Sequence, residues 1–323
     1  MGPFARVCDT IVGMTWFSDD SESELYAFEP ERFLVPPTEG FLRRLFGARW
    51  GMILVSAPDS VRLSPILDFL ADFSLQIAYY SEFSAETGDF ERLEPEEHRL
   101  ETIREVLEEA RGMLPGHQEE VPVQEQEDEG VVRHVPRNPE CVFVQELRPA
   151  IVPETIETAL SGRLVVSGIR AEGSFPALQM FRGLVGSDHL AAASLMGILG
   201  LNTVARICPD CKITVEHQID QNDLFFIGGG PETVQSCRGA GCPSCGGTGH
   251  RGRILIHEAF ELSEKIRAGL LEAVPPRRLR IHAKREGMST LLDAAWSLMD
   301  AGETTLEEVI RIADITDPGP DEP

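Results

Sequence analysis

Apolar and polar positions follow two alternating patterns along most of the chain. Predominantly apolar runs of strand length, such as residues 52–55 and 164–169, are separated by stretches in which apolar residues recur every three or four positions. The first pattern is typical of strands buried on both faces, and the second of amphipathic helices. Their alternation predicts an α/β fold in which helices cover both faces of a sheet. The predicted strands are residues 52–55, 72–81, 141–148 and 164–169, and the predicted helices are residues 39–46, 66–70, 95–114, 154–160, 175–184 and 191–204.

The two ends of the chain differ from this central part. Residues 7–17 alternate weakly and predict a strand within a short N-terminal segment, residues 1–40. A carboxylate-dense loop at about 115–135 and the tail at 316–323 predict disorder, because they hold too little apolar surface to bury. Beyond residue 255 the apolar spacing is helical again. The helices predicted there are residues 263–271, 277–286, 290–299 and 304–312.

The charge of the chain disfavours two classes of partner, nucleic acid and anionic lipid. It has 323 residues, 42% of them apolar, with a formal net charge of −24 and a sequence pI near 4.7. Such a field repels nucleic acid and anionic lipid over most of the surface, which disfavours nucleic-acid binding. No apolar run is long enough for a membrane span, and the N-terminal residues lack the pattern of a signal peptide. A cytoplasmic protein is therefore expected.

Four of the seven cysteines form two Cys-x-x-Cys pairs about thirty residues apart. The pairs are Cys208 with Cys211 and Cys242 with Cys245, and a proline follows the first cysteine of each. Two such pairs supply the four thiolates of a tetrahedral zinc site, and four protein ligands leave no position for a reactive water. The pattern therefore predicts structural zinc, in preference to four reduced thiols without a ligand, and a reducing compartment.

Residues 50–70 predict a strand, a turn and a helix, which is the setting of a phosphate-binding loop. The turn lacks the groups that bind phosphate. Ala57, Ser60 and Arg62 stand where glycines would let backbone N–H groups converge, and Leu63 stands where a lysine would meet the phosphates. Ser64 remains at the position of a magnesium ligand. This part of the chain predicts a nucleotide-type loop that has lost its nucleotide.

A carboxylate and a guanidinium follow the predicted strand that begins at Cys141. An acidic group at the C-terminal end of a buried strand suits a general base or a magnesium-bound water, so Glu146 is the candidate catalytic residue. Arg148 is a candidate for phosphate contact or for holding Glu146. The alternative is an ordinary strand end with a local ion pair.

The order of these motifs resembles the ATPases of type II secretion and type IV pilus assembly. Gly51 to Val55 resembles the strand before the family's phosphate loop, and the closest match is the cysteine-rich region. The resemblance covers roughly residues 40–315. Its further segments are residues 138–148 (the Gly-Glu-Ile-Arg strand), 159–170 (the histidine segment), 204–212 and 241–253 (the zinc region), 256–258 (Gly-Ile-Tyr-Glu) and 302–311 (the closing helix).

The resemblance implies a RecA-like P-loop NTPase core with a zinc-binding insertion and a helical C-terminal subdomain. The expected boundaries are 41–205 for the core, 206–255 for the zinc region and 256–315 for the helical subdomain. The family's acidic box aligns with residues 80–83, which makes Glu82 a remnant of the nucleotide and magnesium site beside Ser64 and Arg148. The implied partners are components of a secretion or pilus assembly machine, including a catalytic paralogue, in a hexamer at the inner membrane.

Departures from the family pattern decide the expected activity. The phosphate-loop lysine is Leu63, the last histidine of the histidine segment is Arg170, and the glycine before the catalytic glutamate is Gln145. Loss of the phosphate-binding groups removes both binding and rate, so a pseudo-ATPase with a structural or regulatory role is favoured and bound ATP with magnesium is not expected. The alternatives are an active motor with an unconventional loop and a stand-alone zinc interaction module.

Overall fold

The computed structural model describes residues 36–48, 50–80, 90–93, 141–218 and 233–316. The strand predicted at 7–17, the helix at 95–114 and the acidic loop at 115–135 lie outside these residues, as does Glu82. Within the described residues, none of the helices combines the length and the apolar character that a membrane span requires.

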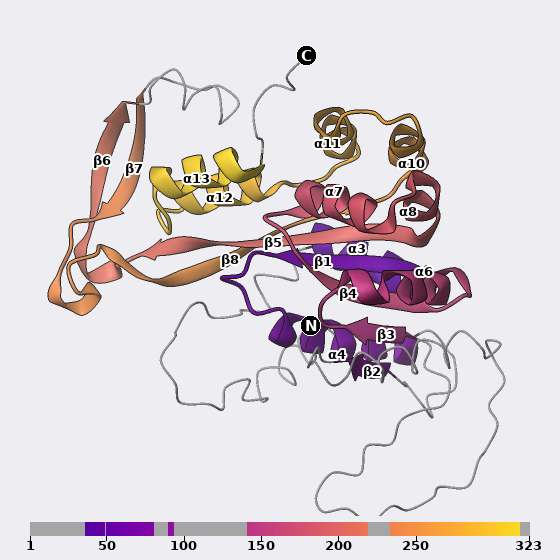
Figure 1. Cartoon of the computed structure of the whole chain (residues 1–323). Helices are drawn as coiled ribbons and strands as arrows, with labels where there is room; N and C mark the ends of the chain where they lie inside the picture. Colours follow the sequence, from indigo (N-terminus) through magenta and orange to yellow (C-terminus); the bar gives the residue numbers. More distant parts are fainter. Residues whose placement is uncertain (1–35, 49, 81–89, 94–140, 219–232, 317–323) are drawn as a thin grey trace, which may run out of the picture.

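In the part of the chain that the structure describes, six strands form one sheet in the order β2-β3-β4-β1-β5-β8 (Figure 1). The first five run parallel to their neighbours, whereas β8 pairs antiparallel with β5 at the edge. Strand β1 is buried along its whole length, as its continuous apolar run predicts. The strands are β1 Gly51–Ala57, β2 Phe90–Leu93, β3 Cys141–Val144, β4 Leu164–Arg170, β5 Leu195–Ile207 and β8 His250–Glu261.

Helices cover both faces of this sheet, which confirms the predicted α/β architecture. Helices α3 and α4 pack on one face around Phe41, Leu45 and Phe69, and five helices pack on the other around Phe175, Phe181 and Phe260. The first group is α3 Pro36–Ala48 and α4 Ser64–Tyr80, and the second is α6 Val152–Leu160, α7 Ser174–Val185, α8 Asp188–Ser194, α10 Glu264–Leu271 and α11 Pro276–Arg285.

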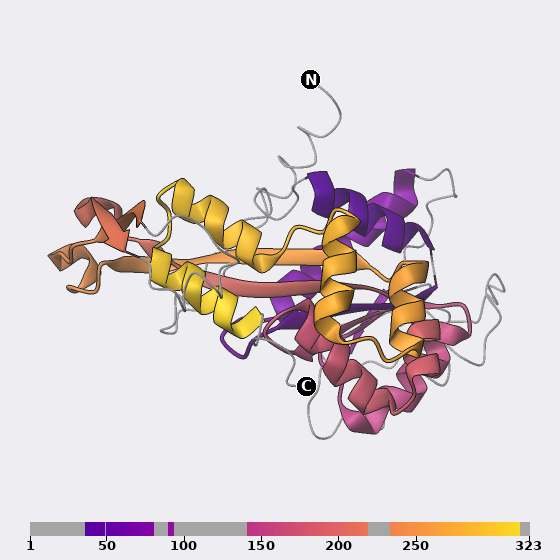
Figure 2. The ribbon, with the colours of Figure 1, turned by 90° about the horizontal axis from the view of Figure 1, so that it is seen from above.

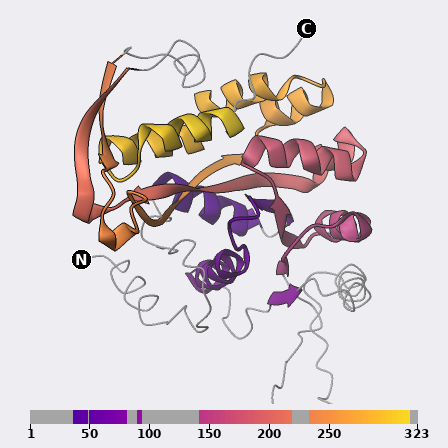
Figure 3. The same cartoon turned by 60° about the vertical axis from the view of Figure 1, so that its left-hand side comes forward.

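Strands β5 and β8 are long and continue together beyond the rest of the sheet (Figure 2). Their far part carries a third apolar core, in which Val204, Ile254 and Ile256 pack against α12 Leu291–Asp300 and α13 Leu306–Thr316. A separate two-stranded ribbon, β6 Lys212–Gln218 and β7 Thr233–Gly239, stands at the end of this extension (Figures 1 and 3). The two cysteine pairs lie where the paired strands β5 and β8 meet the ribbon of β6 and β7.

The strand predicted at residues 72–81 is wrong, because this segment completes α4. Its apolar residues also fit a helical period, since Ile66, Phe69, Leu70 and Phe73 are buried together. No glycine or proline interrupts the chain between Ile66 and Tyr80, so a helix that begins at Ser64 has no local reason to stop.

The apolar helix predicted at residues 191–204 is also wrong. The chain forms the short helix α8 and then enters β5, which lies between β1 and β8. An unbroken apolar run does not by itself distinguish a buried helix from a buried strand. Gly200 of β5 lies against the start of α7, since a Cβ at this position would lie 2.6 Å from the backbone nitrogen of Ser174. The neighbouring chain approaches that closely because β5 has no side chain there.

Candidate functional site

Two loops that the sequence predicts to be parts of a nucleotide site lie at one edge of the sheet. Because β1, β3 and β4 are parallel, their C-terminal ends meet there and bring the loop after Ala57 near the loop that holds Glu146. Gly168 of β4 lies between these loops. A Cβ on Gly168 would lie 2.1 Å from the carbonyl oxygen of Gln145 and 2.8 Å from Cδ1 of Leu63. The two loops therefore pack tightly through a glycine.

The loop after β1 occupies the place of a phosphate loop, but two of its side chains are buried in the core and backbone N–H groups in and just after it donate to nearby carbonyls. Val61 and Leu63 are buried in the core that α4 covers. The N–H of Val61 donates to the carbonyl of Pro58 at 3.0 Å, and the N–H of Ile66 donates to the carbonyl of Leu63 at 3.0 Å. These donors are not directed at a common anion, which is what a phosphate loop requires.

Arg170, at the end of β4, reaches into the same loop. Its Nη1 donates to the carbonyl oxygens of Pro58 at 3.1 Å and Val61 at 2.8 Å. Its Nε lies 3.8 Å from a carboxylate oxygen of the exposed Asp59. A guanidinium thus holds the loop through the carbonyls, whereas nucleotide loops present their amides to phosphate.

Two of the remaining predicted nucleotide residues, Arg148 and Glu146, lie close to each other. Nη2 of Arg148 lies 3.8 Å from Oε2 of Glu146, and both side chains are about one-third exposed. This is the local ion pair that the sequence left open as the alternative. Ser64 begins α4 and is half-buried. The assignments of Glu146, Ser64 and Arg148 stay predictions, and Glu82 lies outside the described residues.

The four cysteines of the two pairs come together in space. The Sγ atoms of Cys208 and Cys242 are 3.8 Å apart, those of Cys211 and Cys245 are 3.9 Å apart, and those of Cys242 and Cys245 are 3.7 Å apart. All four ligand atoms lie within 4.8 Å of one another. Zinc–sulfur bonds of about 2.3 Å in a tetrahedron place the sulfurs about 3.8 Å apart. The cluster therefore fits a metal such as zinc.

Backbone donors surround one sulfur of this cluster. The N–H groups of Cys242 and Gly249 each donate to Sγ of Cys245 at 3.2 Å. The hydrogen bond from Cys242 is the main reason that the pKa of the Cys245 thiol falls to about 6, whereas burial raises the pKa of Cys208 and raises that of Cys211 to about 12. A thiolate at neutral pH is the form that a metal ligates. Gly249 has a φ of +78°, which favours a glycine at this donor.

Glu258 has no role predicted from the sequence, although its segment resembles a family motif. The side chain is 1% exposed in β8. Its Oε1 accepts from the N–H and the Oγ–H of Ser174 at 2.8 and 2.6 Å, and its Oε2 accepts from the N–H of Leu291 at 3.1 Å. Ser174 and Leu291 are the first residues of α7 and α12. One carboxylate therefore satisfies the N-termini of two helices, where a negative charge is favoured.

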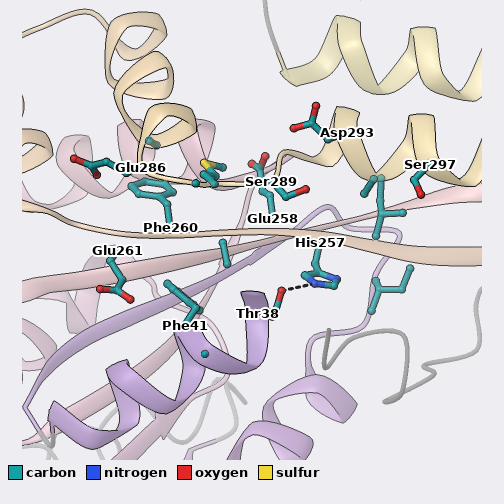
Figure 4. Close-up of a pocket in the computed structure, with 18 of the residues that line it drawn as sticks. Thr38, Phe41, His257, Glu258, Phe260, Glu261, Glu286, Ser289, Asp293 and Ser297 are labelled. Atoms are coloured by element: carbon teal, nitrogen blue, oxygen red, sulfur yellow. Dashed lines mark hydrogen bonds between the residues drawn. The ribbon is translucent and has the colours of Figure 1, made fainter. Parts of the chain in front are cut away.

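A groove of about 820 Å³ follows the outer edge of β8 (Figure 4). It runs between α3, which supplies Thr38 and Phe41, and α12, which supplies Asp293 and Ser297. His257 points toward α3, where its Nε2 lies 2.7 Å from Oγ1 of Thr38 (Figure 4). Burial lowers the pKa of His257 to about 4, so the ring is neutral at pH 7.

The chain resembles solved structures over most of its length. The ATPase DotB of Legionella pneumophila aligns with a TM-score of 0.51 and 11% identity, over 89% of this chain and 65% of that one. DotB of Yersinia pseudotuberculosis aligns with a TM-score of 0.52 and 11% identity, over 90% of this chain and 64% of that one. At this identity the likeness shows the fold, which is the RecA-like α/β core predicted from the sequence.

Sequence comparison gives relatives of known name. The type IV pilus assembly ATPase PilB of Thermus thermophilus is 30% identical over 178 residues, which are 54% of this chain and 20% of that protein. The type II secretion system ATPase E of Vibrio cholerae is 28% identical over 177 residues, which are 54% of this chain and 35% of that protein. The chain thus spans between a fifth and about a third of the length of these two relatives.

A family profile described as Type II/IV secretion system protein matches residues 117–311. The match includes the cysteine cluster, Glu146 and Glu258. The loop after β1 precedes it, so the altered phosphate loop lies in the part of the chain that the profile does not match. Because the matched residues make up more than half of the sequence, the chain belongs to the type II/IV secretion system protein family.

Proposed function

We propose that this chain is a catalytically inactive relative of the secretion and pilus assembly ATPases, with a structural or regulatory role in such a machine. The observation that carries the proposal is the contact of Arg170 with the carbonyl oxygens of Pro58 and Val61. A γ-phosphate needs converging amides and a lysine, and here a buried leucine, Leu63, stands in the lysine's place. The ion pair of Arg148 with Glu146 further supports a structural use of that carboxylate.

We infer that the four cysteines hold a structural zinc ion. The sulfur distances and the amides around Cys245 support this assignment. Cys208, Cys211, Cys242 and Cys245 would fill all four positions, so the ion would supply folding energy at the far end of the β5–β8 ladder.

The proposed partners follow from the family. They are protein components of a secretion or pilus assembly machine, including a catalytic paralogue, at the cytoplasmic side of the inner membrane, and hexamer formation is proposed on the same basis. The net charge of −24 argues against nucleic acid as a partner.

Equilibrium binding of a fluorescent ATP analogue with magnesium tests the proposal. We expect no saturable binding up to about 1 mM nucleotide, because each group that normally contacts the phosphates is replaced or otherwise engaged. The Vibrio cholerae relative named above serves as the positive control. Micromolar, magnesium-dependent binding that weakens in Glu146→Gln would show that the chain is a working motor instead.

A second measurement addresses the proposed role. The chain is co-expressed with the catalytic ATPase from the same secretion or pilus system, and the mass of any complex is measured by light scattering. A defined mixed complex supports a subunit role. If both proteins elute separately at concentrations of about 50 µM, the subunit role is refuted even where ATP binding is absent.

A further inference from the structure

We propose that residues 10–17 of this chain bind as an added strand along the free edge of β8, in the groove between α3 and α12. This inference does not depend on the proposed function. It rests on the exposed edge of the sheet, on the shape of the groove and on the sequence that leads into α3.

The outer edge of β8 is long and carries no strand among the described residues. β8 has 12 residues and pairs on one side with β5. Natural edge strands are usually shortened or interrupted by proline or lysine, because an open edge invites pairing with another chain. The part of β8 that lines the groove, residues 254–261, contains neither residue. The carboxylate of Glu258 is turned inward and held by α7 and α12, so it does not protect the edge.

The groove has the form of a slot for one strand. Residues from both faces of β8 line it together with α3 on one side and α12 on the other (Figure 4). A strand placed against β8 would therefore be covered on both faces, as β1 is in the middle of the sheet. Such strands are apolar at successive positions rather than at alternate ones.

The acidic groups at the rim already have partners. Glu261 is paired with Arg44, Glu286 accepts from Oγ of Ser263 at 3.1 Å, and Asp293 completes the capping box of α12. The groove therefore does not require a cation from its occupant. An uncharged, apolar segment is the chemistry that fits.

Residues 10–17 have this chemistry. Their sequence, Thr-Ile-Val-Gly-Met-Thr-Trp-Phe, holds no charged residue and is rich in β-branched and aromatic side chains. Its eight residues equal the eight of β8 at 254–261 that line the groove. The chain then enters α3, whose Thr38 lies against His257 of β8. The intervening residues 18–35 can span up to about 60 Å, so they reach any point of the groove.

Trp16 reports on this binding. The full chain has three tryptophans, and Trp50→Phe with Trp296→Phe leaves Trp16 as the single emitter. We expect blue-shifted emission and acrylamide quenching about threefold weaker than for a free tryptophan amide, because the ring is shielded between strand and helix. Ser297→Phe fills the groove from the exposed side of α12 and should restore strong quenching. Ala301→Phe is the matched control, since Ala301 is exposed at the end of α12 and does not line the groove.

Hydrogen exchange of residues 254–261 in the wild-type chain gives an independent readout. We expect these amides to exchange at least about tenfold faster in Val12→Asp/Met14→Asp, because the edge loses its partner strand. Val12→Ile/Met14→Leu should leave the exchange unchanged. Equal exchange in all three chains, or a Trp16 as accessible as the free amide, would overturn the proposal. Protection that grows with concentration together with a dimeric mass would assign the slot to a second copy and overturn it as well.

Discussion

Glu258 and Ser174 are joined by two hydrogen bonds to a single carboxylate oxygen, although they lie 84 positions apart in sequence. The other oxygen accepts from the N–H of Leu291, so one buried side chain of β8 connects the RecA-like core to α12. We expect Glu258→Gln to lower the free energy of unfolding by about 3 kcal/mol, since an amide offers one acceptor where two are used. Denaturant unfolding measures this loss. Glu261→Gln, at the partly exposed partner of Arg44, should change stability by less than about 1 kcal/mol, and equal effects of the two substitutions would contradict the role given to Glu258.

Arg170 holds the loop after β1 by donating hydrogen bonds to carbonyl oxygens of that loop. In Arg170→Ala the oxygens of Pro58 and Val61 lose their donor, so the loop should open locally while the core remains folded. Hydrogen exchange of residues 58–67 is expected to accelerate by about tenfold. Arg285→Ala removes an exposed arginine of α11 and serves as the control. An unchanged exchange rate would mean that Val61 and Leu63 hold the loop without help.

Gly168 allows the two loops at the C-terminal edge of the sheet to approach. Gly168→Ala places a Cβ 2.1 Å from the carbonyl oxygen of Gln145, so β4 and the loop after β3 must move apart. We expect a loss of about 3 kcal/mol of stability. Gly183→Ala has no atom within 4 Å of the new Cβ and lies inside α7, where it should stabilise by about 0.5–1 kcal/mol. Thermal unfolding of the two variants should therefore shift in opposite directions.

His257 in the groove should make the stability of the folded chain decrease as the pH is lowered. The folded-state pKa of His257 is about 4, below the usual 6.5, so the unfolded chain binds more protons between these values. Its contribution to stability is complete above about pH 6.5 and is lost as the pH falls toward 4, with an upper limit of about 3 kcal/mol. Stability of the wild type and of His257→Gln measured from pH 7 to pH 4.5 should converge toward the acid end. His282→Gln, on α11, should keep the wild-type slope.

Metal content tests the cysteine cluster. We expect about one zinc ion per purified chain, and less than about 0.2 in Cys211→Ser, because three thiolates no longer complete the tetrahedron. The melting temperature should fall in the same variant and in wild type treated with a chelator. Cys141→Ser, at the start of β3, is the matched control and should retain the metal. Zinc-free wild type with an unchanged melting temperature would contradict a structural ion.

The sequence predicted those parts of the fold whose patterns are local. The apolar run of β1 and the helical spacing of apolar residues in α6, α7 and α13 each led to the element observed. β5 was missed because its residues are apolar on both faces, and the reason for a strand there lies in its neighbours β1 and β8. The pairing of the cysteines followed from spacing alone. The roles of Arg170 and Glu258 could not be predicted, because each depends on partners that are between 33 and 112 positions away along the chain.

The long antiparallel pair of β5 and β8 has a consequence for any assembly that contains this chain. β5 begins beside β1 and ends at Ile207, one position before Cys208, over a length of about 40 Å. Its 13 residues form one strand, with a shift in its pairing to β8 near Ala205, so the cysteine cluster is held at the far end of β5, beyond the part that pairs with β1. In a subunit that does not cycle through nucleotide states, β5 would hold the cluster at a constant distance from the core, and the subunit would act as a spacer of fixed length between its neighbours.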